Sequence, residues 1–270
     1  MTIKIVMLKT KKVLQKHHFH LFLFFSVVIV VGFVYNVFNI REGFLQTTSI
    51  NLKPGEWMQV PNSRLSALDP CKDADCSYTG SQGQKAIVTA YNGAAFDSVR
   101  NQLLVWGGGN KDYGGNEVYA FSLDSLSWSK LNEPSVDVEL LGSDPSVYAD
   151  GMPRSRHTYD YLEFVQERNE LCSFGMAYAF PDGTSDSKKT QCFSIVDLEW
   201  KNYATNSGVG STNGSVTARD NATGKIYWHG GQSSKSGLME YTPSTDSWKS
   251  LTSSSIPSNL NAAFHPEKKM

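Results

Sequence analysis

Three copies of one motif follow one another along the chain, and this repetition limits the possible folds more than any other feature. In each copy a short apolar run ends at a glycine, a polar turn follows, and an alternating run ends at a tryptophan. The residues at these positions are Gly107, Gly108 and Trp128, then Gly175 and Trp200, then Gly230, Gly231 and Trp248. Internal repeats of this kind indicate that one small structural unit is built several times and stacked on its neighbours.

The first two copies align without a gap, residues 89–108 against residues 157–176. The aligned pairs include Tyr91 with Tyr159, Phe96 with Phe164, Arg100 with Arg168, Trp106 with Phe174, and Gly107 with Gly175. A third copy begins at residue 217, and a fourth begins at residue 262 with Phe264 at the position of Phe96. The copies therefore share more than the glycine and the tryptophan.

Strand and turn signals dominate the chain after residue 45, where helical periodicity is weak. Runs such as residues 118–123, followed by turn residues, are typical of β-hairpins. Glycines at the end of an apolar strand permit positive φ angles and close backbone approach. A tryptophan in each copy supplies a large ring to bury between adjacent sheets. The sequence therefore predicts an all-β body of four-stranded units.

This arrangement resembles the kelch repeat, most closely that of exported bacterial propellers similar to galactose oxidase. The residues that carry the resemblance are Arg154-x-x-His157, Trp106-Gly107-Gly108, Phe174-Gly175, His229-Gly230-Gly231 and the three trailing tryptophans. The resemblance covers residues 54–270 and implies a kelch-type β-propeller with about three blades in this chain. The second copy has Met176 in place of a second glycine, and the third lacks the Arg-x-x-His, which weakens those repeats. A propeller built from another repeat type is the alternative.

An earlier tryptophan, Trp57, has no glycine pair ahead of it. Propellers commonly close their ring by pairing an N-terminal strand with strands from the end of the chain. We therefore expect Trp57 to lie in a closing strand, the last strand of a blade whose other strands would follow Met270. Because the fourth copy stops before its second apolar strand, the expected propeller is incomplete and truncated at its C-terminus.

The first 53 residues have a different character from the body. Residues 19–40 contain no Asp, Glu, Lys or Arg, and a helix needs about 20 residues to cross a bilayer core. Five lysines precede this run, so the positive-inside rule predicts a cytoplasmic basic tail (1–16), a transmembrane signal anchor (17–40) and a linker (41–53). A cleaved signal peptide and a buried core helix are alternatives. The prediction is a single-pass membrane protein with its body in the periplasm or outside the cell.

All four cysteines follow the apolar run, in a compartment that permits disulfides. Cys71 and Cys76 bracket a short polar loop that a disulfide would close, while Cys172 and Cys192 fall in neighbouring strand-like runs. The sequence alone leaves three pairings open. No metal site is predicted, because no C-x-x-C pair occurs and three of the six histidines lie at the membrane edge.

The charge of the chain argues against one class of partner. Formal net charge is −1 and the isoelectric point is about 6.6, which gives no electrostatic support for binding nucleic acid. We expect a binding module that presents loops to a protein or a glycan. The alternatives are a carbohydrate-active enzyme, either an oxidase or a sugar epimerase, that uses the propeller mouth, and a fragment without a function of its own.

The densest cluster of charged side chains is formed by Arg154, Arg156 and His157. Guanidinium groups present fork-shaped donors that suit an anion or an acidic sugar, so these three residues are the candidate ligand-binding residues. The resemblance implies another role, in which the Arg-x-x-His braces neighbouring blades by hydrogen bonds. No combination of residues predicts a catalytic site or a cofactor.

Overall fold

The computed structural model describes residues 52–138, 144–206, 213–231, 237–252 and 261–268. The chain divides into two compact parts, Met1–Ser49 and Ile50–Met270, and all described residues belong to the second. The predicted basic tail and signal anchor thus lie outside the described residues, as does nearly all of the predicted linker. In the ranges that the structure describes, no helix is long and apolar enough to cross a membrane.

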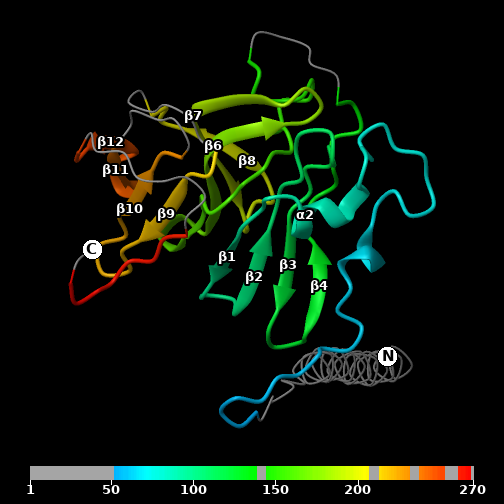
Figure 1. The fold of residues 1–270 in the computed structure, drawn as a ribbon, viewed down its shortest axis with the longest axis horizontal. Coiled ribbons are helices and arrows are strands. Elements are labelled where there is room, and N and C mark those ends of the chain that lie inside the picture. The colour runs from blue at the N-terminus through cyan, green and yellow to red at the C-terminus, as the bar shows by residue number, and fades with distance from the viewer. Residues whose placement is uncertain (1–51, 139–143, 207–212, 232–236, 253–260, 269–270) are drawn as a thin grey trace, which may run out of the picture. The chain divides into compact units, whose positions relative to one another are not determined.

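The described strands form three antiparallel sheets, and each copy of the motif supplies one of them (Figure 1). Sheet 1 consists of β1 (Ala94–Asp97), β2 (Gln102–Val105), β3 (Tyr119–Ser122) and β4 (Ser127–Lys130). Sheet 2 consists of β5 (Leu162–Val165), β6 (Glu170–Ala179), β7 (Thr184–Ser194) and β8 (Trp200–Tyr203). Sheet 3 consists of β9 (Val216–Arg219), β10 (Ile226–His229), β11 (Leu238–Thr242) and β12 (Ser247–Ser250). Within each sheet the strands are neighbours in chain order, so the all-β prediction is confirmed.

The turns repeat from sheet to sheet as closely as the strands do. In the turn between the first two strands, one residue of each sheet has a positive φ angle: Asn101, Asn169 and Gly224. In the turn before the last strand, the residue two places ahead of the tryptophan also has one: Leu126, Leu198 and Asp246. Glycine, asparagine and aspartate tolerate the left-handed conformation better than other residues, and they hold four of these six positions.

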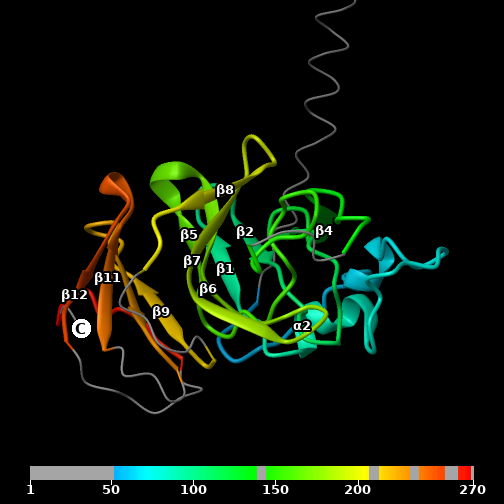
Figure 2. The same ribbon diagram turned by 90° about the horizontal axis from the view of Figure 1, so that it is seen from above.

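Sheet 2 lies between the other two sheets, and apolar side chains fill both spaces (Figure 2). Between sheets 1 and 2, the Trp200 ring packs 4.8 Å from the Trp106 ring, measured between centroids. Between sheets 2 and 3, the Trp248 ring lies 5.9 Å from Phe174 and 4.9 Å from Tyr241. The prediction that these tryptophans pack between adjacent sheets is therefore confirmed for the second and third copies.

The segment before β1 covers the outer face of sheet 1. Leu65, Tyr78 and Ile87 from this segment pack with Val105 and Tyr119 of the sheet. The helical segments of the described residues are all short: Leu65–Leu68, Gly83–Lys85, α2 (Ala86–Thr89), Gln166–Arg168 and Pro243–Thr245. The four cysteines form two disulfides, Cys71–Cys76 in this segment and Cys172–Cys192 between β6 and β7. The segment before β1 and sheet 2 thus cover the two faces of sheet 1.

The structure corrects the prediction of a closing strand at Trp57. Residues 52–60 belong to no strand, and the Trp57 side chain is 97% exposed. A strand needs a partner strand for its backbone hydrogen bonds, and residues 52–60 pair with none of the three sheets. No ring closure is present among the residues that the structure describes.

Replacing Trp57 with alanine should change the free energy of unfolding by less than about 0.5 kcal/mol, because an almost fully exposed ring loses no packing. The same substitution at Trp200 should lower it by about 3 kcal/mol, because that ring fills the space between sheets 1 and 2. Denaturant unfolding of the full-length chain, followed by fluorescence, measures both. A loss at Trp57 as large as that at Trp200 would show that Trp57 is packed.

Candidate functional site

The structure buries the arginines of the predicted ligand-binding cluster. The Arg154 side chain is fully buried, and its Nε donates to the carbonyl oxygen of Phe180 at 2.7 Å. One terminal nitrogen donates to the Pro145 carbonyl oxygen at 2.7 Å, and the other forms an ion pair with Asp182. This guanidinium therefore holds two loops together and presents no free donor edge to a ligand at the surface.

Arg156 occupies an equally enclosed position. Its nitrogens donate, over 2.8 to 3.1 Å, to the carbonyl oxygens of Arg154, Gly175 and Ser146 and to the side-chain oxygen of Gln191. The guanidinium carbon also lies 5.1 Å from the centroid of the Trp106 ring. Arg156 thus connects the loop before β5 to the second and third strands of sheet 2 and to the aromatic core between sheets 1 and 2.

His157 lies among three tyrosines at the same end of the sheets. Its ring centroid is 5.2 Å from that of Tyr91, 6.0 Å from Tyr159 and 5.4 Å from Tyr178, and all three tyrosines have positive φ angles. Neither imidazole nitrogen has a hydrogen-bond partner among the described residues. The Asp112 carboxylate lies 3.6 Å from Nε2, which is too far for a hydrogen bond. Burial lowers the pKa of His157. His157 is 4% exposed and Tyr91 is 68% exposed, so the cluster presents tyrosine to solvent.

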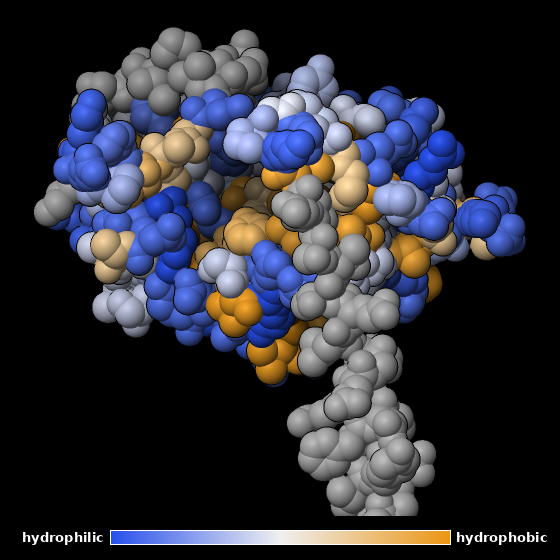
Figure 3. Space-filling view, turned by 90° about the horizontal axis from the view of Figure 1, so that it is seen from below, coloured by the Kyte–Doolittle hydropathy of each residue, from blue (hydrophilic) through white to orange (hydrophobic). Residues whose placement is uncertain are grey.

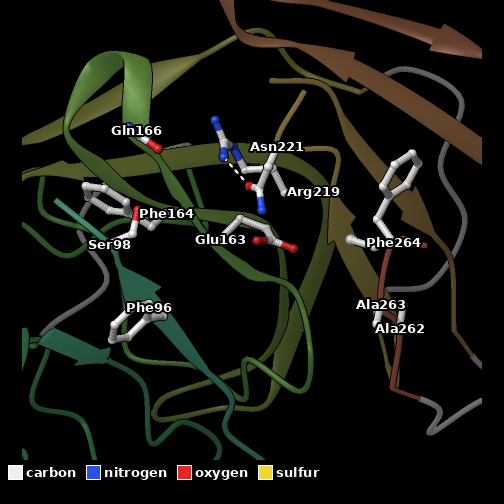
Figure 4. Close-up of a pocket in the computed structure, with 11 residues that line it drawn as sticks. Phe96, Ser98, Glu163, Phe164, Gln166, Arg219, Asn221, Ala262, Ala263 and Phe264 are labelled. Carbon is white, nitrogen blue, oxygen red and sulfur yellow. Dashed lines mark hydrogen bonds between the residues drawn. The ribbon is translucent and has the colours of Figure 1, made fainter. Parts of the chain in front are cut away.

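A cavity of about 360 Å³ opens near the other end of the first strands, where β1, β5 and β9 approach segment 262–264 (Figure 4). The side chains that line it are Phe96, Ser98, Glu163, Phe164, Gln166, Ala218, Arg219, Asn221, Ala262, Ala263 and Phe264. Figure 3 views the molecule from below, where hydrophobic side chains lie in and around a hollow bordered by hydrophilic ones. All three sheets contribute to the cavity, whereas the arginine cluster draws mainly on sheet 2.

The cavity combines aromatic faces with a few converging polar groups. Phe96 is 49% exposed at the cavity wall, and the Glu163 carboxyl group points into the open space toward segment 262–264 (Figure 4). Arg219 supplies the guanidinium on the β9 side, where it donates to Asn221 at 2.6 Å and forms an ion pair with Glu167. Apolar walls with a small number of placed polar groups are typical of small-molecule sites.

Glu163 is the residue of the cavity lining whose pKa is shifted from its usual value. The pKa of its carboxyl group is raised to about 7, chiefly by desolvation on burial and also by the nearby Asp160 carboxylate. The Thr217 hydroxyl and the Arg219 guanidinium act in the opposite direction. Glu163 therefore exchanges a proton near neutral pH, as acid–base groups and ligand-linked carboxyls do.

Among the described residues, one group of side chains has the spacing of metal ligands: Glu170, Cys172 and Cys192, all buried. The two sulfur atoms are joined in a disulfide, and the Glu170 carboxylate forms an ion pair with Arg168 at 3.0 Å. A metal ion is bound by thiolates, and a disulfide offers none. In this oxidised state the group holds the sheet together and offers no metal site.

Glu163 was not among the residues singled out from the sequence, although the repeat contains a signal for it. The alignment of the copies places Glu163 at the position of Ala95 in the first copy and Ala218 in the third. Ala95 is buried in the core between sheets 1 and 2. A carboxylate at a repeat position otherwise held by alanine departs from the structural pattern of the repeat, and this departure is the signal in the sequence.

Comparisons with known proteins add no relative to these observations. No protein-family model matches the chain, and no curated protein matches it. What the structure shows is an all-β body of three repeated antiparallel sheets, with a polar and aromatic cavity at the first strands.

Proposed function

We propose that this chain is a membrane-anchored, exported, kelch-like propeller that binds a glycan in the cavity beside Glu163. The single observation that carries the proposal is the convergence of β1, β5 and β9, the first strands of three successive sheets, on one cavity. A hydrogen bond of 2.7 Å from the Thr217 amide to the Asp160 carbonyl oxygen joins the second and third sheets at this place. In a propeller, the first strands of the blades surround the central axis.

The packing of one phenylalanine supports the propeller interpretation. Phe164, in the first strand of sheet 2, packs in the core shared with sheet 1. Phe264 holds the equivalent position in the fourth copy, and its ring stacks on Tyr227 of sheet 3 with centroids 5.7 Å apart and planes 6° apart. Each of these phenylalanines thus packs against the preceding sheet, as expected where blades follow one another around an axis.

The character of the cavity favours a glycan over a protein as the ligand. A cavity of about 360 Å³ suits a small molecule or the terminal sugar of a longer chain. Sugar hydroxyls both donate and accept hydrogen bonds, which matches a lining of carboxyl, amide, hydroxyl and guanidinium groups. The exposed face of Phe96 offers a surface for the C–H face of a sugar ring.

A second candidate function, a carbohydrate-active enzyme, is favoured by one specific observation. The pKa of Glu163 is raised to about 7, which suits a general acid or base at neutral pH. Asp160, whose carboxylate contributes to that raised pKa, supplies a second acidic group beside it. Conversion of a bound sugar, detected by chromatography of the ligand after incubation, would assign this role in place of simple binding.

Phe96→Ala should weaken sugar binding about fivefold or more, because the loss of one aromatic contact removes roughly 1 kcal/mol or more. The test titrates the full-length chain in lipid nanodiscs with a panel of neutral mono- and disaccharides and measures binding by calorimetry. Tyr91→Ala is the matched control, since Tyr91 is an exposed aromatic residue at the other end of the first strands.

Two outcomes would overturn the proposal. In one, no sugar of the panel binds the wild-type chain. In the other, Phe96→Ala and Tyr91→Ala weaken binding equally, which would place the sugar outside the cavity.

A further inference from the structure

We propose that the cavity accepts an uncharged sugar through the ionised carboxylate of Glu163, so that acidification of the medium releases the ligand and acidic sugars are excluded. This inference rests on the proposed binding function and adds the charge class of the ligand and the regulation of its release. Three features of the cavity carry it: the balance of charges, the hydrogen-bonding of Glu163, and the position of Glu163 at the cavity wall.

The balance of charges around the cavity is negative. Asp160 and Glu163 belong to the β5 side, and the groups that face them from β9 are Thr217 and Arg219. Arg219 is the one cation among the described residues that line the cavity, and its guanidinium already forms an ion pair with Glu167. A uronic or sialic acid would therefore bring its carboxylate next to two carboxyl groups whose nearest cation is already paired.

One hydroxyl among the described residues, that of Thr217, stabilises the ionised form of Glu163 and lowers its pKa, but desolvation by burial outweighs this effect. That hydroxyl has a single proton, and the Asp160 carbonyl oxygen, 2.9 Å away, is a second acceptor for it. Two neighbouring hydroxyls of a sugar ring would each donate to one carboxylate oxygen. Hydrogen bonds to an ionised acceptor are roughly twice as strong as those between neutral groups, so the ionised form of Glu163 binds the sugar better than the protonated form.

The direction of the pH dependence follows from this preference. With a pKa of about 7, the free carboxyl group is mostly protonated at pH 6 and mostly ionised at pH 8. A ligand that selects the ionised form must displace the proton at pH 6, so its affinity falls as the pH falls. For a group of this pKa, binding should be about tenfold weaker at pH 6 than at pH 8.

The experiment titrates the full-length chain in nanodiscs with the sugar that binds most tightly, at pH 6 and at pH 8. Glu163→Gln should bind the sugar more weakly than wild type at pH 8 and should lose the pH dependence, because an amide does not ionise. Glu133→Gln is the matched control, since the Glu133 side chain is 79% exposed and does not line the cavity. This variant should keep the tenfold dependence of the wild type.

A second measurement needs no variant. Calorimetry of the wild-type chain near neutral pH, in two buffers of different ionisation enthalpy, should show that sugar binding releases protons. The matching uronic acid should bind at least tenfold more weakly than the neutral sugar at pH 8.

The outcomes separate this inference from the proposed function. Equal affinity at pH 6 and pH 8, proton uptake on binding, or a Glu163→Gln variant that keeps the pH dependence would each overturn the inference while sugar binding stands. Preferential binding of the uronic acid would also overturn it. Absence of binding by every sugar at both pH values would overturn the proposed function itself.

Discussion

Replacing Arg156 with alanine is expected to lower the free energy of unfolding by about 4 kcal/mol, among the largest effects of any single substitution in this chain. The side chain is fully buried, and among the described residues its removal leaves the Arg154 carbonyl oxygen and the Gln191 side-chain oxygen without a donor, while the Ser146 and Gly175 carbonyl oxygens keep one other donor each. Each buried acceptor without a partner costs about 1–3 kcal/mol. Chemical denaturation of the full-length chain, followed by fluorescence, measures the change.

Arg64→Ala is the control for that experiment. Arg64 is exposed, so its removal should change the free energy of unfolding by less than about 0.5 kcal/mol. If Arg156→Ala were as stable as Arg64→Ala, Arg156 would not brace the loop before β5. The arginine would then be available to an acidic ligand, as the sequence alone allowed.

The contacts of Arg156 also explain why two nearby arginines need not mark a binding site. A guanidinium group has five N–H donors, and in a protein interior each donor needs an acceptor. Arg154 and Arg156 together donate to six backbone carbonyl oxygens: those of Pro145, Ser146, Arg154, Gly175, Ala179 and Phe180. Charge density in a sequence does not reveal whether the donors face the chain or the solvent.

The local features of the fold follow from the sequence because each copy carries its own turn chemistry and its own core residues. Asn101 and Asn169 align in the sequence, and both adopt the left-handed turn conformation. Trp200 and Trp248 align, and both pack between neighbouring sheets. A motif that recurs with its turn residues in register therefore predicts strand order and the residues between sheets with little ambiguity.

Features that depend on distant parts of the chain could not be predicted in the same way. Trp57 resembles the repeat tryptophans in its local sequence, yet a strand there needs a partner with a free edge. The segment that contains Leu65 and Tyr78 covers sheet 1 instead, and no periodicity in that segment predicts this.

The cavity was missed for a similar reason. Its walls come from three sheets and from segment 262–264, so no short motif contains it. Glu163 stands out only when the copies are aligned and Ala95 is known to be buried. In this chain, the residue that departs from the shared pattern lines the cavity, whereas the arginines of the densest cluster of charges are buried.

Gly107→Ala should lower the free energy of unfolding by about 4 kcal/mol, because two separate effects add at this position. The glycine has a φ angle of +131°, a conformation that residues with a side chain adopt only with strain. An added Cβ would also lie 2.6 Å from Oδ1 of Asn92 and 2.8 Å from the Arg156 carbonyl oxygen. Thermal or denaturant unfolding of the full-length chain provides the measurement.

The Asn92 side chain beside Gly107 is not free to move aside. Asn92 donates to the Ala86 carbonyl oxygen at 2.9 Å and accepts from the Thr158 amide at 2.9 Å, so its side chain is fixed at both ends. Gly151→Ala separates strain from overlap, because Gly151 has a φ angle of +82° and nothing within 4 Å of the added Cβ. That control should cost about 1 kcal/mol. Equal losses of unfolding free energy at the two glycines would mean that the loop can shift to make room for the added Cβ. Gly107 would then be needed for its positive φ angle and not for close packing.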